Sequence, residues 1–156
     1  MTDRPSLITR EEVMFFDTDA GGVVHNIAYL RFIETCRTRL AGLMGMNMRE
    51  MMAAGEVPVV VRTEIDYCCP ALLSDHLEIH GVLDSMERAR FWCRFEIVRP
   101  VDGSLLVKCR QALALVNLKS GRPARLPAEW RERYRPEKPA DKRPDVSIHG
   151  SGPPHG

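Results

Sequence analysis

The chain has 156 residues, of which 44% are hydrophobic and 28% charged, and its formal net charge is +1. This length and composition fit one globular domain with a buried core. The near-neutral charge gives no indication of a nucleic-acid partner, and no apolar run reaches the roughly 18 residues of a membrane span. The first residues lack the apolar segment of a secretory signal, so we expect a cytoplasmic protein.

The first third of the sequence predicts a strand, a tight turn and a long helix. The apolar cluster in residues 10–17 favours a strand end, and the DAGG run after it is typical of a turn. In residues 26–45 the apolar positions recur at three- and four-residue steps, which is the period of an amphipathic helix. The expected buried face comprises Tyr29, Leu30, Ile33, Cys36, Leu40, Leu43 and Met44, and the expected polar face comprises Glu34, Arg37, Thr38 and Arg39.

The remainder of the chain predicts a short helix in residues 47–58, followed by strands. The strand-like segments are 58–69, 76–87, 88–100 and 105–119. Short links between them favour antiparallel pairing. The prediction is therefore an α+β fold, with a long central helix wrapped by a five-stranded antiparallel β-sheet.

Domain organisation follows from where the composition changes. Residues 1–134 form one expected domain. Residues 135–156 are rich in proline, glycine and charge, which predicts a disordered tail. One helix is too short to cover five strands, so we expect a second copy of the chain to bury part of the sheet.

The five cysteines do not indicate a special site. Their number is odd and their spacing fits no metal-binding template. We interpret them as reduced thiols and expect no metal.

Two aspartates precede the long helix, and their position admits two interpretations. The start of a helix presents unpaired N–H groups that can polarise a carbonyl oxygen. Asp19, just before this start, could then attack the carbonyl or take a proton from water. An aspartate in such a turn can equally be a cap that stabilises the backbone.

The run FFDTDAGGVVHNIAYLRFIETCR, residues 15–37, resembles the 4-hydroxybenzoyl-CoA thioesterase-like branch of the hotdog-fold acyl-CoA thioesterases. The matching positions are Asp17, Asp19, Gly22, Val24, Tyr29, Glu34 and Arg37. The resemblance extends over about residues 8–134. It implies a hotdog fold and hydrolysis of an acyl- or aroyl-CoA thioester to the free acid and coenzyme A, without a cofactor.

The resemblance also implies roles at the turn. Asp19 takes the position of the catalytic carboxylate, and the backbone N–H of Asn26 takes that of the group that polarises the thioester. Asp17 is then expected to hold the turn. His25 departs from the family pattern, and both an acid–base role and simple packing stay open for it.

Substrate contacts are carried over in the same way. Gly22, Val24 and Tyr29 are expected near the substrate, with packing as the alternative for Tyr29. Glu34 and Arg37 lie three residues apart on the helix, which fits an ion pair near the site, with Glu34 as a reserve catalytic carboxylate.

Arg88 and Arg90 are the expected contacts for the phosphates of coenzyme A. Strand alternation would place both on one side, although a solvated surface is the simpler interpretation. The resemblance implies a homodimer with the active site at the interface, which would let one of these arginines act across it, or a dimer of dimers.

Two other functions stay open on the same fold. One is a protein that binds acyl-CoA or acyl-carrier protein without hydrolysis. The other is an enoyl-CoA hydratase or dehydratase with His25 as its base.

Overall fold

The structure is a computed structural model, and it describes residues 4–134. The predicted tail, residues 135–156, lies outside the described residues. Strand β1 (Ser6–Glu12) leads into a 3₁₀ turn, η1 (Phe15–Asp17). Two helices follow, α1 (Asn26–Leu43) and α2 (Met48–Ala54).

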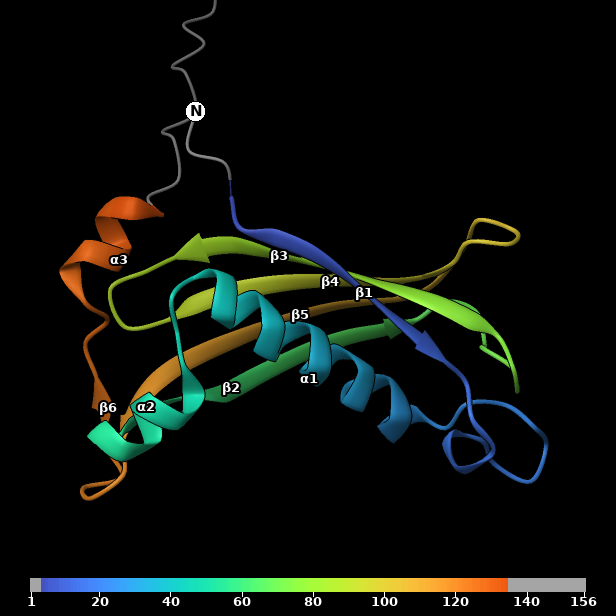
Figure 1. The fold of residues 1–156 in the computed structure, drawn as a ribbon, viewed down its shortest axis with the longest axis horizontal. Helices are drawn as coiled ribbons and strands as arrows, with labels where there is room; N and C mark the ends of the chain where they lie inside the picture. The colour runs from blue at the N-terminus through green and yellow to red at the C-terminus, as the bar shows by residue number, and fades with distance from the viewer. Residues whose placement is uncertain (1–3, 135–156) are drawn as a thin grey trace, which may run out of the picture.

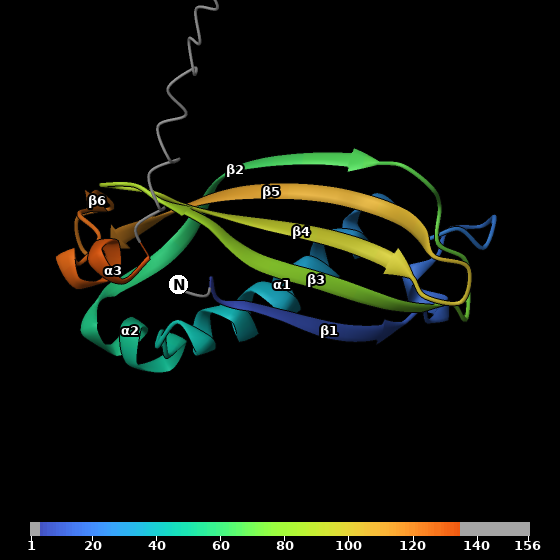
Figure 2. The same cartoon turned by 90° about the horizontal axis from the view of Figure 1, so that it is seen from above.

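The rest of the described chain forms most of one antiparallel sheet. Its strands are β2 (Glu56–Tyr67), β3 (His76–Met86), β4 (Phe91–Arg99), β5 (Ser104–Asn117) and β6 (Pro123–Ala124). Helix α3 (Ala128–Arg133) is the last element of the described residues. The order across the sheet is β1-β3-β4-β5-β2, and the two-residue β6 pairs with the end of β5. The sheet arches over α1, as Figures 1 and 2 show. The predicted α+β architecture is confirmed, with β6 as a short additional strand.

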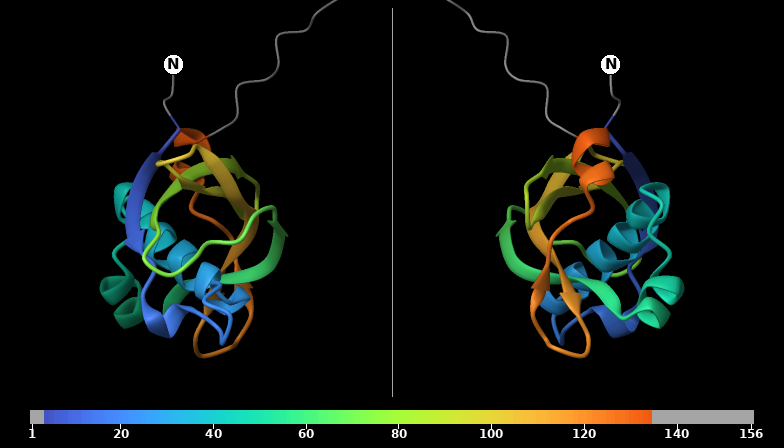
Figure 3. Two further views of the ribbon diagram at one scale, coloured as in Figure 1. Left: turned by 90° about the vertical axis from the view of Figure 1, so that its right-hand side faces the viewer. Right: turned by 90° about the vertical axis from the view of Figure 1, so that its left-hand side faces the viewer.

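Helix α1 fills the concave side of the sheet, which is clearest along the strands in Figure 3. Its side chains Phe32, Ile33 and Cys36 are fully buried. The helix and the sheet come close together at Gly81 of β3, where an added Cβ atom would lie 2.7 Å from Sγ of Cys36. A glycine is needed here because any side chain would push the helix off the sheet.

The expected buried face of α1 was wrong at two positions. Leu30 and Leu43 are exposed, whereas Ala28 and Phe32 are buried. Three- and four-residue steps are also satisfied by positions at the margin of an apolar stripe, so the periodicity alone does not separate margin from centre.

The expected strand end in residues 10–17 was also wrong. Strand β1 stops at Glu12, and Phe15 and Phe16 are 81% and 72% exposed. The chain turns because the Asp17 N–H donates to the Met14 carbonyl at 3.0 Å, which closes η1. No helix in residues 4–134 has the length and apolar character needed to cross a membrane.

Candidate active site

Asp17 is a buried anchor for the segment before α1, with only 2% of its surface exposed. Its Oδ1 atom pairs with Nη2 of Arg31 at 2.9 Å, and its Oδ2 atom accepts the Met14 N–H at 2.9 Å. Its main-chain carbonyl accepts the His25 N–H at 3.1 Å. One residue thus joins η1, the start of α1 and the second turn of that helix. This placement agrees with the turn-holding role expected for Asp17.

Asp19 lies in a small hairpin, and its carboxylate is exposed. A bridge between Thr18 and Val24 closes the hairpin. The Oδ1 atom of Asp19 accepts the Gly21 N–H at 2.8 Å and the Val23 N–H at 3.4 Å. The stabilising turn contact is therefore made, but it uses only one oxygen. Within residues 4–134 the Oδ2 atom has no hydrogen-bond partner, so the turn fixes the carboxylate and leaves this oxygen available.

The start of α1 lies directly after this hairpin. His25 is the residue before the helix, and its carbonyl accepts the Ala28 N–H at 3.0 Å. The N–H groups of Asn26 and Ile27 have no partner in the described part of the chain, as the first turn of a helix requires. The His25 Nε2 atom lies 3.3 Å from the Phe16 carbonyl, so the ring contacts η1.

A second loop, residues 70–75, holds the hairpin in place. The Leu73 N–H donates to the Gly22 carbonyl at 3.1 Å, and the Val24 N–H donates to the Ala71 carbonyl at 2.9 Å. Gly22 has φ +73°, a left-handed conformation that favours glycine. In this structure Gly22 and Val24 position the Asp19 hairpin through their backbones.

Tyr29 braces the same loop from the helix. It is buried, and its hydroxyl oxygen accepts the Ala71 N–H at 2.9 Å. Its ring lies 5.7 Å from that of Tyr67, and burial raises the pKa of Tyr29. The contacts of the chain favour the packing interpretation of Tyr29.

Arg99 and Arg31 are positioning residues that the sequence analysis missed. Nη1 of Arg99 contacts Oδ2 of Asp75 at 2.9 Å, which ties the end of β4 to the 70–75 loop. Arg31 neutralises the buried Asp17. Each partner is distant in sequence and no motif spacing links them, so only the fold reveals these pairs.

Glu34 and Arg37 form the expected ion pair, with 3.8 Å between Oε1 and Nη2. The two side chains differ in burial, because Glu34 is 67% exposed and Arg37 only 19%. Nη1 of Arg37 donates to Oε1 of Gln111 at 2.7 Å, and Nε2 of Gln111 donates to Oγ1 of Thr63 at 3.2 Å. The expectation that Arg37 belongs to the solvent face was wrong, since it reaches the sheet, where burial lowers its pKa.

Arg88 and Arg90 do not lie on a strand. Strand β4 begins at Phe91, and both arginines belong to the turn after β3, where the Glu87 N–H donates to the Arg90 carbonyl at 2.7 Å. The expected alternation was therefore wrong. This turn lies at the end of the sheet opposite the Asp19 hairpin, as Figure 1 shows. Within one protomer the two arginines are remote from Asp19.

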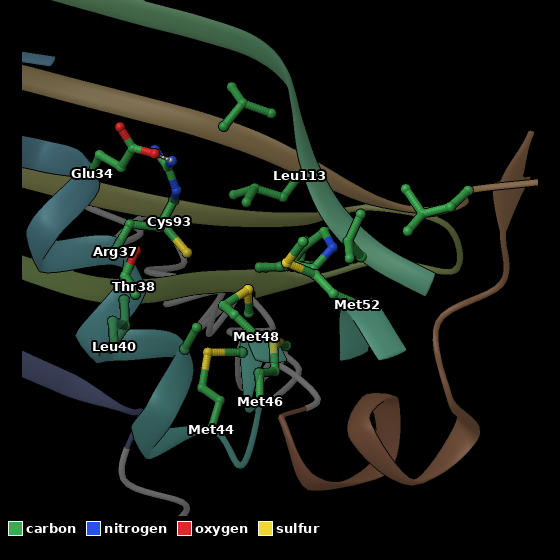
Figure 4. Close-up of a pocket in the computed structure, with 16 residues that line it drawn as sticks. Glu34, Arg37, Thr38, Leu40, Met44, Met46, Met48, Met52, Cys93 and Leu113 are labelled. Atoms are coloured by element: carbon green, nitrogen blue, oxygen red, sulfur yellow. Dashed lines mark ion pairs between the residues drawn. The ribbon is translucent and has the colours of Figure 1, made fainter. Parts of the chain in front are cut away.

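A cavity of about 340 Å³ lies between α1, α2 and β2. Its polar lining comes from Glu34, Arg37 and Thr38 on α1. Figure 4 shows these three at one side and methionine side chains around the remainder. The four methionines are Met44, Met46, Met48 and Met52. We call this space the methionine cavity; it was not foreseen because it depends on how α2 packs over β2.

The long helix enclosed by an antiparallel sheet, with a carboxylate at the helix start, defines a hotdog fold of the thioesterase type. A family model described as the thioesterase-like superfamily matches residues 13–134, and the chain belongs to this family. Membership confirms the resemblance found in the sequence and the predicted class of enzyme, a thioester hydrolase.

Individual relatives agree with this assignment. The chain is 30% identical over 118 residues to an acyl-CoA thioesterase, YbgC, of Haemophilus influenzae, covering 75% of this chain and 85% of that protein. It is 31% identical over 115 residues to the acyl-CoA thioester hydrolase YbgC of Escherichia coli, covering 74% and 85%. The crystal structure of a 1,4-dihydroxy-2-naphthoyl-CoA thioesterase from Synechocystis superposes with a TM-score of 0.74 at 22% identity, covering 82% of this chain and 94% of that chain, which shows the shared fold.

Proposed function

We propose that the chain is an acyl-CoA thioesterase that releases coenzyme A and a free acid, with Asp19 as its catalytic carboxylate. The observation that carries the proposal is the Asp19 hairpin. Its turn holds the carboxylate through Oδ1 and leaves Oδ2 without a partner in the described chain, beside a helix start with two unpaired N–H groups. A carboxylate next to backbone donors is the pair of groups that acyl transfer requires.

The proposed chemistry divides the work between these groups. The carbonyl oxygen of the thioester accepts from the N–H of Asn26, aided by that of Ile27, and the developing negative charge is stabilised there. Asp19 Oδ2 either attacks the carbonyl carbon, forming an anhydride, or takes a proton from the attacking water. In both routes the C–S bond breaks and coenzyme A leaves as its thiolate, which takes up a proton released by the water. In the first route this water then hydrolyses the anhydride, which frees the acid and restores the Asp19 carboxylate. No cofactor or metal takes part.

Loss of the Asp19 carboxylate tests the proposal directly. We expect Asp19→Asn to lower kcat for coenzyme A release by about 10²-fold or more, a typical cost for losing one transition-state group. Glu34→Gln is the matched control, because Glu34 is another exposed acid and lies on α1, the helix that follows the Asp19 hairpin. Release is followed by chromatography over short, long and aromatic acyl-CoAs.

Three outcomes would contradict the proposed role of Asp19 as the catalytic carboxylate of a thioesterase. An Asp19→Asn enzyme with full activity beside an inactive Glu34→Gln enzyme would move the site to the helix. Absence of hydrolysis for every thioester would leave a binding protein. Enoyl-CoA hydration that is lost only in His25→Ala would favour the hydratase. Single turnover in ¹⁸O-labelled water, with label sought in Asp19, separates the anhydride route from direct water attack.

The proposed active unit is a homodimer formed through the edge of β2. No strand in residues 4–134 pairs with the outer edge of this 12-residue strand. Long free edges are sites for strand addition, and Val59, Val61 and Tyr67 leave exposed apolar surface along this one. Two copies related by a two-fold axis would pair their β2 edges antiparallel.

This dimer would place the parts of one site on two protomers. The Asp19 hairpin lies beyond the end of β2, through its bridge from Val23 to Leu72, and the β3–β4 turn lies at the opposite end. Antiparallel pairing therefore brings one hairpin toward the end that carries Arg88 and Arg90 of the other protomer. This supports the proposal that one of these arginines contacts the phosphates of coenzyme A across the interface. A dimer of dimers and a cytoplasmic location stay predictions.

A further inference from the structure

The methionine cavity and Asp19 lie toward opposite ends of α1: Asp19 precedes the start of the helix, and the cavity lies along its later turns. Eight residues separate the helix start at Asn26 from Glu34, the nearest lining residue, which corresponds to about 12 Å along the axis. Met44 lies about 27 Å from the helix start on the same measure. A thioester held at Asn26 cannot readily place its acyl group among the methionines of the same protomer.

The proposed pairing of β2 edges removes this separation. The cavity is lined by Val57, Pro58 and Val60, from the first half of β2. The Asp19 hairpin adjoins the segment that follows β2. In an antiparallel pair the first half of one β2 lies beside the second half of the other. The hairpin of one protomer is thereby carried toward the methionine cavity of its partner.

The lining of the cavity selects the kind of acyl group. Met44 and Met46 are buried, Met48 is half-buried, and apolar side chains of β4 and β5 complete the floor. Thioether side chains are flexible and adapt to a flexible hydrocarbon. An apolar cavity of about 150 Å³ holds one benzene molecule, so about 340 Å³ accommodates roughly 10–14 carbons of a chain.

Resting on the proposed function, we infer that the methionine cavity holds the acyl chain of a substrate whose thioester lies at Asp19 of the partner protomer. The substrate class is then linear aliphatic acyl-CoA of medium length rather than hydroxylated aroyl-CoA. The charged and hydroxyl side chains that line this cavity, Glu34, Arg37 and Thr38, lie at one side, so an aromatic hydroxyl among the methionines would lose its hydrogen bonds.

Binding measurements test the cavity without requiring hydrolysis. The probes are S-alkyl-CoA thioethers with ethyl, hexyl, decyl and hexadecyl chains, and S-(4-hydroxybenzyl)-CoA, titrated calorimetrically into the full chain. Affinity should rise by up to about fourfold per methylene, the value of one buried CH₂ group, and should stop rising at roughly 10–14 carbons. The hydroxybenzyl probe should bind at least tenfold more weakly than the decyl probe.

Filling the cavity should shorten the preferred chain. In Met48→Trp, on α2, the ratio of decyl to ethyl affinity should fall at least tenfold. Ala41→Leu, on α1, should lower the same ratio. Leu43→Trp is the matched control, since Leu43 is exposed on α1 and does not line the cavity. A length profile that neither cavity variant changes would overturn the inference, as would tighter binding of the hydroxybenzyl probe.

Mixed dimers test whether the site is shared between protomers. Asp19→Asn and Met48→Trp chains are coexpressed with different tags, and hydrolysis of decanoyl-CoA is compared with each variant alone. A shared site pairs the intact Asp19 of one chain with the intact cavity of the other in half of the dimers, restoring about one quarter of the native rate. A rate no higher than the mean of the two parents would overturn the inference.

The two proposals fail in different ways. If the probes show the length profile and Met48→Trp shifts it, but no thioester is hydrolysed, the cavity is supported and the catalytic proposal fails. If thioesters are hydrolysed through Asp19 with no preference for chain length, the catalytic proposal stands and the cavity inference fails.

Discussion

The two ends of α1 differ in the chemical groups that they present to a substrate. At its start lie the exposed Asp19, whose carboxylate has a free oxygen within the described chain, and the unpaired N–H groups of Asn26 and Ile27. Toward its end lies the methionine cavity, whose floor includes Met44 and Met46. One end supplies groups that stabilise charge, and the other supplies apolar volume.

The polarity of the helix explains why these properties separate. Only the first turn presents unpaired N–H groups, and the last turn presents carbonyls, so an oxyanion is stabilised at the start alone. A large apolar cavity needs more than one element around it, and α2 and the first half of β2 enclose such a space with the later turns of α1. A two-fold axis at the β2 edge would join the two ends of different protomers into one site.

Preventing the pairing of β2 edges should separate the Asp19 hairpin of one protomer from the methionine cavity of the other. We expect this change to have the largest effect on thioesterase activity. The double variant Val59→Asp, Val61→Asp places two charges on the exposed apolar positions of this strand, which should prevent pairing. We expect a monomer by size-exclusion chromatography with light scattering, and a fall in thioesterase activity of about 10²-fold or more, because each site loses half of its parts.

The opposite edge of the sheet provides the control for this experiment. Ile8 is exposed on β1, and Ile8→Asp puts the same kind of charge there. The β1 variant should keep the native mass and activity. A Val59→Asp, Val61→Asp protein that stays dimeric, or a fully active monomer, would contradict the shared site.

Substitutions of the two aspartates that precede α1 should differ in their effects: one should lower stability and the other should lower activity. Asp17→Asn leaves Arg31 without its buried carboxylate, and we expect about 1–3 kcal/mol less stability in urea unfolding. Asp19→Asn can keep the turn contacts through its amide oxygen, so its stability should change by less than about 0.5 kcal/mol while activity is lost. Equal destabilisation by both changes would mean that Asp19 is only another anchor.

The architecture was predictable because its signals are local. The apolar period of residues 26–45 indicated α1, and hairpin-length links indicated antiparallel strands. The family pattern added the distinction between Asp17 and Asp19, which periodicity alone left open. Local signals failed where tertiary packing decides, as at Phe15 and Phe16, whose apolar side chains are exposed in the 3₁₀ turn η1.

The contacts around the candidate site were less predictable because they join residues that are far apart in the sequence. Arg37 reaches Gln111, 74 positions further along the chain, and a long side chain can point to either side of a helix. Arg99 meets Asp75 only because β4 ends beside the 70–75 loop. The methionine cavity requires the placement of α2, which helical periodicity does not define.

The buried thiol in the wall of the methionine cavity should make stability depend on pH, and this is the smallest effect that we expect. Cys68 is exposed just after β2, whereas burial raises the pKa of Cys93, in the wall of the methionine cavity, from 9.0 to about 12. Between these values the unfolded chain loses the Cys93 proton and the folded chain keeps it. Stability from this group is therefore complete below pH 9 and declines as the pH rises toward 12.

Replacing Cys93 should reduce this alkaline loss. The free energy of unfolding is measured in urea at pH 8 and at pH 11, with a phosphine reductant present. Between these pH values we expect Cys93→Val to lose less stability than the native chain, with a difference of up to about 2 kcal/mol. Cys68→Val is the control, because Cys68 is exposed after β2 and does not line the methionine cavity. An equal decline in all three proteins would mean that the cavity wall around Cys93 is open to solvent, which would also weaken its assignment as the apolar end of the site.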